Sequence, residues 1–335
     1  MAVATEGLET LEDMIVRQAE ATAAQVAAAK TAIGKVIFGQ EKVVEQALIT
    51  VLCGGHALLI GLPGLAKTKL VETMGTVLGL DGRRIQFTPD LMPSDIVGSE
   101  VLDEGVGGKR SFRFIGGPIF CQLLMADEIN RASPRTQSAL LQAMQEHHVT
   151  VAGTRHDVPR PFHVLATQNP IEQEGTYPLP EAQLDRFLMQ IDVDYPDREN
   201  ERKIVFDTTG TEESKPKPTM TADELLAAQR LVRRLPVGES VVDAILKLVR
   251  SARPGVESGE TGKSISWGPS PRASQALMLV ARARALLDGR LAPSVDDVME
   301  MAEPILKHRM ALTFAARADG ETVEAIIAKL TSRIG

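Results

Sequence analysis

Residues 61–68 read Gly-Leu-Pro-Gly-Leu-Ala-Lys-Thr, and they follow the apolar run 57–60. A helix-compatible stretch begins at Lys69. A strand, a glycine-containing loop, a Lys-Thr pair and a helix in this order allow backbone N–H groups and the helix N-terminus to surround a phosphate group. Lys67 can then reach the outer phosphates, and the Thr68 hydroxyl can ligate Mg²⁺. This segment therefore predicts an α/β domain that binds a phosphorylated ligand.

Ala66 stands where such loops commonly carry a second glycine before the lysine. Glycine is required only where φ is positive or where a Cβ atom would clash. An alanine is compatible with the loop if its dihedral angles are already helical. The phosphate-binding interpretation thus predicts helical dihedrals at Ala66.

Apolar runs of strand length recur along the first two thirds of the chain, separated by helical or loop segments. Nearly continuous apolar runs are typical of parallel strands that are covered on both faces. They predict a doubly wound parallel sheet in an α/β core of about residues 30–196. The alanine-rich helical pattern before this core predicts an N-terminal helix in residues 1–29. The runs are residues 57–60, 84–88, 121–126, 162–167 and 187–192.

Two segments interrupt this alternation with the pattern of β-hairpins. Residues 96–115 contain a glycine cluster that begins at Gly105, and residues 148–158 contain an Ala-Gly turn. Residues 197–221 end in a stretch rich in Thr, Glu, Lys and Pro, which indicates an exposed linker. Residues 222–335 have a helical pattern without further strand-like runs, so we expect a small all-α domain there.

Polar side chains follow two of the predicted strands. Asp127 and Glu128 come directly after one strand, and Asn169 follows the next. Because ligands bind at the carboxyl ends of parallel strands, Asp127 could hold the water shell of Mg²⁺ and Glu128 could orient and deprotonate a water. Asn169 could hydrogen-bond a phosphate or that water. A solvated acidic turn and a simple Asn-Pro turn are the alternatives, and the phosphate loop upstream favours the functional interpretation of the acidic pair.

Two arginines occupy positions that invite a ligand. Arg186 lies at a helix-to-strand junction, where it could stabilise phosphoryl charge on the nucleotide of a neighbouring subunit. The simpler alternative is a salt bridge to Asp185 or Glu181. Arg272 falls in the first turn of a predicted helix, which is unfavourable to the helix dipole and suggests contact with a nucleotide phosphate.

Four segments together resemble the motifs of the AAA+ ATPases, and specifically those of the MoxR family. They are residues 61–68, 125–132, 166–170 and 181–187, in the family's order and spacing. The resemblance extends from about Gly34 to the C-terminus. It implies a P-loop NTPase core with a C-terminal helical lid, and ATP and Mg²⁺ as ligands.

The resemblance assigns roles by position. Asn169 matches sensor 1, Arg186 matches the arginine finger and Arg272 matches sensor 2. Arg131 could share or replace the finger role of Arg186. The implied catalytic set is Lys67, Asp127, Glu128, Asn169, Arg186 and Arg272, and the implied metal ligands are Thr68 and Asp127.

The resemblance also implies which residues surround the nucleotide. Residues 37–40 are similar to the segment that lines the adenine, and Ala66 is usual in the family's phosphate loop. The two hairpins resemble inserts that point toward the central pore of a ring. The implied nucleotide contacts are Ile37, Phe38, Gly39, Gln40, Gly61, Pro63, Gly64, Leu65, Ala66, Lys67, Thr68 and Lys69.

Composition restricts the partners and the compartment. The net charge of −7 offers no global basic field to nucleic acid. The apolar runs are far shorter than the roughly 20 residues that span a bilayer, and the N-terminus is acidic, unlike a signal peptide. Cys53 and Cys121 lie in apolar surroundings without CxxC spacing, as free thiols do in a reducing compartment. We therefore expect a cytoplasmic protein without a membrane span.

The predicted function is Mg²⁺-dependent ATP hydrolysis by a hexameric ring. The nucleotide is expected between the α/β domain and the helical lid, with Arg186 supplied by a neighbour. The resemblance implies a chaperone-like role in maturing client proteins or inserting metals and cofactors, with a partner that carries a von Willebrand factor A domain. Two alternatives stay open: a nucleic-acid motor, which the acidic charge disfavours, and a nucleotide-gated scaffold with negligible turnover.

Overall fold

The fold is described from a computed structural model, which covers residues 11–104, 110–172, 175–210 and 216–334. Its centre is a five-stranded parallel sheet in the order β2-β5-β8-β1-β9. Each of the five predicted apolar runs overlaps one of these strands, so the doubly wound α/β prediction is confirmed. The strands are β1 (Ala57–Gly61), β2 (Gly82–Gln86), β5 (Leu123–Asp127), β8 (His163–Gln168) and β9 (Met189–Val193).

The sheet is buried on both faces, because successive side chains of its strands enter two different hydrophobic clusters. On β5, Leu123 and Met125 pack into the cluster on one face, while Leu124 and Ala126 pack into the cluster on the other. This is the period-two alternation of a strand between two layers. It explains why β5 reads as an unbroken apolar run and why that run predicted a strand.

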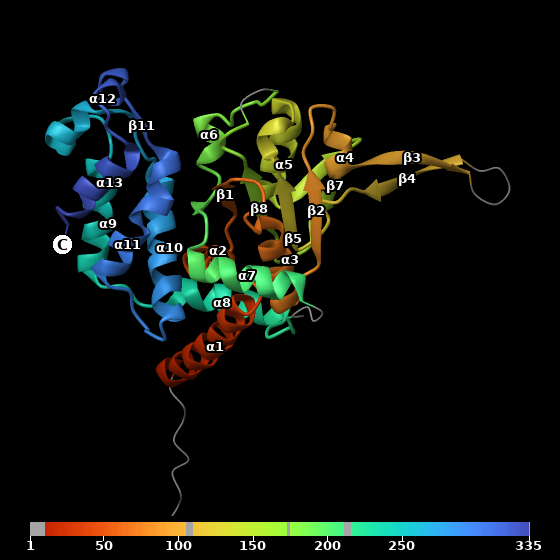
Figure 1. Cartoon of the computed structure of the whole chain (residues 1–335). Helices are drawn as coiled ribbons and strands as arrows, with labels where there is room; N and C mark the ends of the chain where they lie inside the picture. The colour runs from red at the N-terminus through yellow and green to blue at the C-terminus, as the bar shows by residue number, and fades with distance from the viewer. Residues whose placement is uncertain (1–10, 105–109, 173–174, 211–215, 335) are drawn as a thin grey trace, which may run out of the picture.

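Helices cover both faces of the sheet (Figure 1). One side carries α4 and α5, whose buried residues join the second cluster. Ser133 caps the N-terminus of α5, and its hydroxyl accepts a hydrogen bond from the N–H of Thr136. The other side carries α1, α2, α3 and α8. The helices of the core are α1 (Leu11–Gly34), α2 (Glu41–Leu52), α3 (Lys67–Val77), α4 (Pro93–Val97), α5 (Pro134–Glu146), α6 (Glu181–Leu184), α7 (Arg198–Thr209) and α8 (Ala222–Arg234), with the 3₁₀ turn η1 (Ile129–Arg131).

The C-terminal part of the chain is a helical lid that packs beside the sheet domain (Figure 1). It contains one antiparallel pair of strands, β10 and β11, so the expectation of a segment without strands is wrong. Strands of two or three residues are too short to show a period in the sequence. The lid consists of α9 (Glu239–Ser251), η2 (Val256–Lys263), β10 (Ile265–Trp267), α10 (Pro271–Leu287), α11 (Val295–Leu306), η3 (Lys307–Arg309), β11 (Ala311–Leu312), α12 (Phe314–Ala318) and α13 (Val323–Thr331).

Both predicted hairpins are present. The first joins β3 (Gly98–Glu104) to β4 (Arg110–Gly116) and extends from the side of the molecule opposite the lid (Figure 1). The second joins β6 (His148–Val151) to β7 (Thr154–Asp157). Phe114 of the first stacks on His156 of the second, with ring centroids 3.8 Å apart. The glycine cluster predicted from Gly105 onward lies outside the described residues.

The segment expected as a linker contains a helix, α7, within residues 197–221. Asp197 caps it, because its side chain accepts a hydrogen bond from the N–H of Asn200. The helix buries none of its residues fully, so its hydrophobic periodicity is weak in the sequence. Within the part of the chain that the structure describes, no helix is long and apolar enough to cross a membrane.

Candidate nucleotide-binding site

Two adjoining cavities meet at the loop between β1 and α3, at the carboxyl ends of the strands. One has a volume of about 540 Å³ and the other about 460 Å³, a size typical of small-molecule sites. The first is lined by Val36, Ile37, Phe38, Gln40, Gly64, Leu65, Ala66, Lys69, Pro196, Ile204, Asp207, Thr208 and Gly210. The second is lined by Pro63, Gly64, Leu65, Ala66, Lys67, Thr68, Lys69, Arg84, Gln86, Asp127, Glu128, Thr167, Gln168 and Asn169.

Most of the predicted nucleotide contacts line one of these cavities. Gly39 and Gly61 do not line either of them. Gly39 has φ +70, and a Cβ atom there would lie 2.7 Å from the Cβ of Asn200. It therefore allows α7 to approach the chain beside residues 37–40. Gly61 instead uses its carbonyl, which accepts a hydrogen bond from Lys67.

Ala66 adopts left-handed dihedrals, with φ 57° and ψ 19°. The expectation of helical dihedrals is therefore wrong: α3 begins at Lys67, and Ala66 is its N-terminal cap. The left-handed turn at Ala66 brings the chain from the loop into α3. A glycine at this position would be free of strain. Strained residues of this kind are concentrated at functional sites.

Replacing Ala66 by Gly is expected to raise the free energy of unfolding by about 1 kcal/mol, because glycine adopts positive φ without the clash of a Cβ atom. Chemical denaturation measures this change. Ala24→Gly, at an exposed helical position of α1, is the matched control and should lower stability by about 1 kcal/mol. A destabilised Ala66→Gly protein would contradict the left-handed geometry.

Lys67 points back into its own loop. Its Nζ donates hydrogen bonds to the carbonyls of Gly61 at 2.5 Å and Leu62 at 2.7 Å. Burial lowers its pKa, and the carboxylates of Asp127 and Glu128 oppose that change. The ammonium is thus held in the second cavity facing two acids, where phosphate oxygens can replace the carbonyls as acceptors.

Asp127 ends β5 and is fixed by two neighbouring strands. The Thr167 hydroxyl of β8 donates to its Oδ1 at 2.5 Å, and Arg84 of β2 donates to its Oδ2 through Nη2 at 2.5 Å and Nε at 3.2 Å. The Thr68 hydroxyl belongs to the same cavity. One carboxylate and one hydroxyl are the sparse set of oxygen donors that Mg²⁺ accepts when phosphates and waters complete its shell, so these residues fit that ion.

Glu128 follows in the left-handed region, with φ 55°, and this turn directs its side chain into the cavity. The amide of Gln86 donates to its Oε2 at 2.7 Å, and Arg131 donates to the same oxygen at 3.1 Å. Arg131 also lies 3.8 Å from Glu172. In this chain Arg131 thus pairs with the acid beside its own cavity.

Asn169 directly follows β8 and is buried, with an exposed fraction of 7%. Its Oδ1 accepts a hydrogen bond from the N–H of Ile171 at 3.2 Å. This contact fixes the amide group on the wall of the second cavity, opposite the phosphate loop. The structure thus brings Lys67, Thr68, Asp127 and Glu128 together with Asn169, as the sequence predicted.

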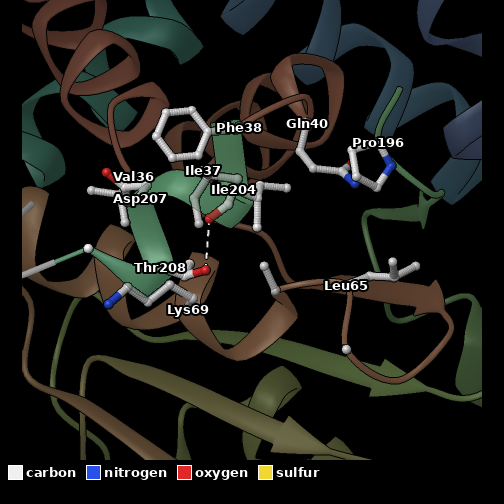
Figure 2. Close-up of a pocket in the computed structure, with 13 residues that line it drawn as sticks. Val36, Ile37, Phe38, Gln40, Leu65, Lys69, Pro196, Ile204, Asp207 and Thr208 are labelled. Atoms are coloured by element: carbon white, nitrogen blue, oxygen red, sulfur yellow. Dashed lines mark hydrogen bonds between the residues drawn. The ribbon is translucent and has the colours of Figure 1, made fainter. Parts of the chain in front are cut away.

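The lid does not close the first cavity. Its far wall is α7, which contributes Ile204, Asp207 and Thr208, while Phe38 and Gln40 come from the segment between α1 and α2 (Figure 2). No described residue beyond Gly210 lines either cavity. The expected position of a nucleotide between the α/β domain and the lid thus stays a prediction, because only the α/β domain and α7 line these two cavities.

Arg186 and Arg272 line neither cavity. Arg272 is exposed and its Nη1 lies 3.8 Å from Asp185. Burial and then the charge of Arg272 lower the pKa of Arg186, while Glu146 opposes them. Among the described residues the Arg186 guanidinium has no hydrogen bond or ion pair, and the alternative of a salt bridge to Asp185 or Glu181 is not observed. The two arginines form a cationic site away from the chain's own cavities.

Comparisons with known proteins agree with this geometry. The profile of the "ATPase family associated with various cellular activities (AAA)" matches residues 56–189, and that of the "AAA lid domain" matches residues 260–330. Chaperone MoxR1 of Mycobacterium tuberculosis is 41% identical over 321 residues, which cover 94% of this chain and 84% of the relative. Protein MoxR of Paracoccus denitrificans is 33% identical over 303 residues, which cover 85% of this chain and 88% of the relative.

The chain belongs to the MoxR family of AAA+ ATPases.

The fold agrees as well. A crystal structure of a candidate ATPase from Cytophaga hutchinsonii superposes with a TM-score of 0.87 at 36% identity, covering 95% of this chain and 97% of the other. The parallel sheet, the phosphate loop and the helical lid are thus those of an AAA+ ATPase, as the sequence predicted.

Sequence reasoning missed several residues of this MoxR family member's site. Arg84, Gln86 and Thr167 contact the two acids after β5, and α7 supplies a wall of the first cavity. Arg84 and Gln86 alternate on β2, so they project from the same face of that strand. Their spacing is a possible signal, but it becomes informative only once β2 is known to lie beside β5.

Proposed function

We propose that this chain is a Mg²⁺-dependent ATP hydrolase that assembles into a hexameric ring in the cytoplasm and remodels client proteins. The observation that carries the proposal is the convergence of one lysine, two acids and one amide on the second cavity. Beside it lies the first cavity, whose lining residues are mostly apolar. The second cavity suits a triphosphate and the first suits a nucleobase. Buried free thiols such as Cys53 are stable in a reducing compartment.

Each residue of the cavity has a part in the hydrolysis we propose. Lys67 donates to the outer phosphates and offsets their charge, and Asn169 orients the attacking water through its amide. Glu128 accepts a proton from that water, and its hydrogen bonds from Gln86 and Arg131 hold the carboxylate in place. Mg²⁺, held by Thr68 and Asp127, would supply further charge neutralisation at the phosphates.

Assembly into a ring would add two arginines to the cations that already line the second cavity. Hydrolysis of a triphosphate needs cations at the transferred phosphoryl group, and Arg186 and Arg272 lie away from their own chain's cavities. We propose that they act on the nucleotide of a neighbouring subunit. Hydrolysis is thereby linked to contact between subunits.

The surface of the β3–β4 hairpin supports a protein client. Leu102 and Phe112 are exposed there, and exposed apolar side chains of this size mark sites of protein contact. The arginines of the hairpin pair with its own acids, Arg113 with Asp103 at 3.1 Å. Cations paired in this way are poorly placed to release counterions from nucleic acid, which is a further argument against a nucleic-acid motor.

The relatives named MoxR and MoxR1, the latter called a chaperone, support the assignment of a chaperone. We propose that this chain matures clients, by metal or cofactor insertion or by assembly of complexes, together with a partner that carries a von Willebrand factor A domain. An affinity capture with a variant that binds but does not hydrolyse ATP tests this role, and recovery of no reproducible protein partner would contradict it.

Replacing Lys67 by Ala is expected to weaken ATP binding by about 10- to 100-fold, because a charge-assisted hydrogen bond is worth about 1.5–3 kcal/mol. Fluorescence titration with an ATP analogue measures the affinity. Lys42→Ala, at an exposed position of α2, is the matched control and should leave it unchanged. Equal affinities of the wild-type and Lys67→Ala proteins would exclude the phosphate role of this lysine.

A further inference from the structure

Arg309 is a fully buried arginine at the joint between the lid and the sheet domain. Its side chain belongs to η3 and is 2% exposed. It donates from Nε to Asp185 Oδ1 at 2.7 Å, from Nη2 to the carbonyl of Phe187 at 2.6 Å and from Nη1 to the carbonyl of Leu188 at 3.0 Å. The three acceptors belong to residues that closely precede or follow Arg186 in the sequence. One lid side chain therefore holds the backbone that carries Arg186.

Asp185 extends the same network to the other cationic residue. Its Oδ2 accepts a hydrogen bond from the hydroxyl of Ser270 at 3.0 Å and lies 3.8 Å from Nη1 of Arg272. Ser270 is the N-terminal cap of α10, and its hydroxyl also accepts a hydrogen bond from the N–H of Arg272. The N-terminus of α10 is thus attached to Asp185, the same carboxylate that Arg309 contacts.

The charge of this network indicates a role beyond stability. Arg309 and Arg272 face the carboxylate of Asp185, and burial lowers the pKa of Arg309 while Asp185 opposes the change. Apolar side chains of similar volume often replace a buried ion pair without loss of stability. An apolar residue could not fix the backbone beside Arg186 with directional hydrogen bonds. It also could not hold Asp185, the acid that contacts Ser270 and Arg272.

We propose that Arg309 and Asp185 are positioning residues that hold Arg186 and Arg272 as one rigid unit for the neighbouring subunit's ATP. The proposal rests on the proposed function, in which those two arginines act on that ATP. A movement of the lid is then transmitted through Arg309 to the finger. Catalysis in one subunit becomes dependent on the lid of the next.

The expected effect of Arg309→Lys, or of the milder Asp185→Asn, is a loss of ATP turnover on the order of 10²-fold with unchanged ATP affinity, because small displacements of a catalytic group cost about that much. The matched control is Asp297→Asn. Asp297 is a buried lid carboxylate held by Arg284 and Arg290, and its partners do not touch Arg186. It should reduce stability without a comparable loss of turnover.

Mixing subunits tests the proposal. Subunits with Arg309→Lys or Asp185→Asn keep a working cavity, whereas Lys67→Ala subunits keep a working finger. Their mixture should hydrolyse ATP faster than the sum of the separate rates, because the finger of one serves the cavity of the other. Arg186→Ala mixed with Lys67→Ala is the reference, and thermal unfolding selects the variants that fold.

Two results would overturn the inference, and they are distinguishable. If the reference mixture recovers turnover but neither Arg309→Lys nor Asp185→Asn does so with Lys67→Ala, positioning by this network is wrong while the trans role of Arg186 stands. If the reference mixture also fails to recover, the proposed trans role fails and the inference fails with it.

Discussion

Arg186→Ala is expected to reduce ATP turnover by about 10³- to 10⁵-fold, the range known for an arginine that stabilises phosphoryl charge. The guanidinium has no hydrogen bond or ion pair within the described part of its own chain, and burial and Arg272 lower its pKa. This is why we propose that it acts on a phosphate group bound by a neighbouring subunit. Phosphate release under saturating ATP measures the loss. Arg186→Lys should recover only part of it, because lysine lacks the planar fork of donors.

The matched control is Arg282→Ala. Arg282 lies in α10 of the lid, and burial and the charge of Arg233 lower its pKa in the same way, but it is distant in the sequence from every element that lines the cavities. Arg282→Ala should change ATP turnover by no more than a factor of about two. This factor corresponds to the free-energy change of about 0.5 kcal/mol that is usual for surface substitutions. Equal turnover of the Arg186→Ala and wild-type proteins would contradict the role of Arg186.

Glu128→Gln is expected to reduce ATP turnover by about 10²- to 10⁴-fold, because the amide cannot take a proton from the attacking water. Gln has nearly the same size as Glu and can still accept hydrogen bonds from Gln86 and Arg131, which hold Glu128 at 2.7 and 3.1 Å. ATP affinity should therefore change little. Phosphate release and ATP titration on the same preparation separate the two effects.

Glu172→Gln is the control that tests whether loss of a carboxylate charge beside Arg131 is enough to lower ATP turnover. Glu172 lies 3.8 Å from Arg131, as Glu128 does at 3.1 Å, but it lines neither of the two cavities. If both variants lowered turnover to the same degree, the effect would come from the ion pairs of Arg131, and Glu128 would not be the base.

The sheet and the acids at its edge are predictable because their signals are local. The buried parallel strands read as apolar runs, and the polar residues after β5 and β8 sit where any parallel sheet places its ligand. Lys67, Asp127 and Asn169 could therefore be placed at one site before the order of the strands was known. The positions of Arg186 and Arg272 in the sequence suggested contact with a phosphate, and the resemblance to MoxR proteins assigned them the roles of arginine finger and sensor 2.

The remaining features depend on tertiary contacts that leave little trace in the sequence. Arg84 reaches Asp127 only because β2 pairs with β5. The left-handed dihedrals of Ala66 are imposed by the turn into α3, against the preference of alanine. The position of the lid follows from contacts such as that between Arg309 and Asp185, residues 124 positions apart. These contacts explain why α7, and not the lid, lines the first cavity.

The central claim is that this chain hydrolyses the ATP that it binds and that Glu128 is required for the step. The most direct measurement is a single-turnover experiment, with ATP below the concentration of protein, followed by identification of the nucleotide that stays bound. The account predicts that the wild-type protein returns ADP and that the Glu128→Gln protein returns ATP. Recovery of unchanged ATP from both, or of ADP from both at the same rate, would contradict it.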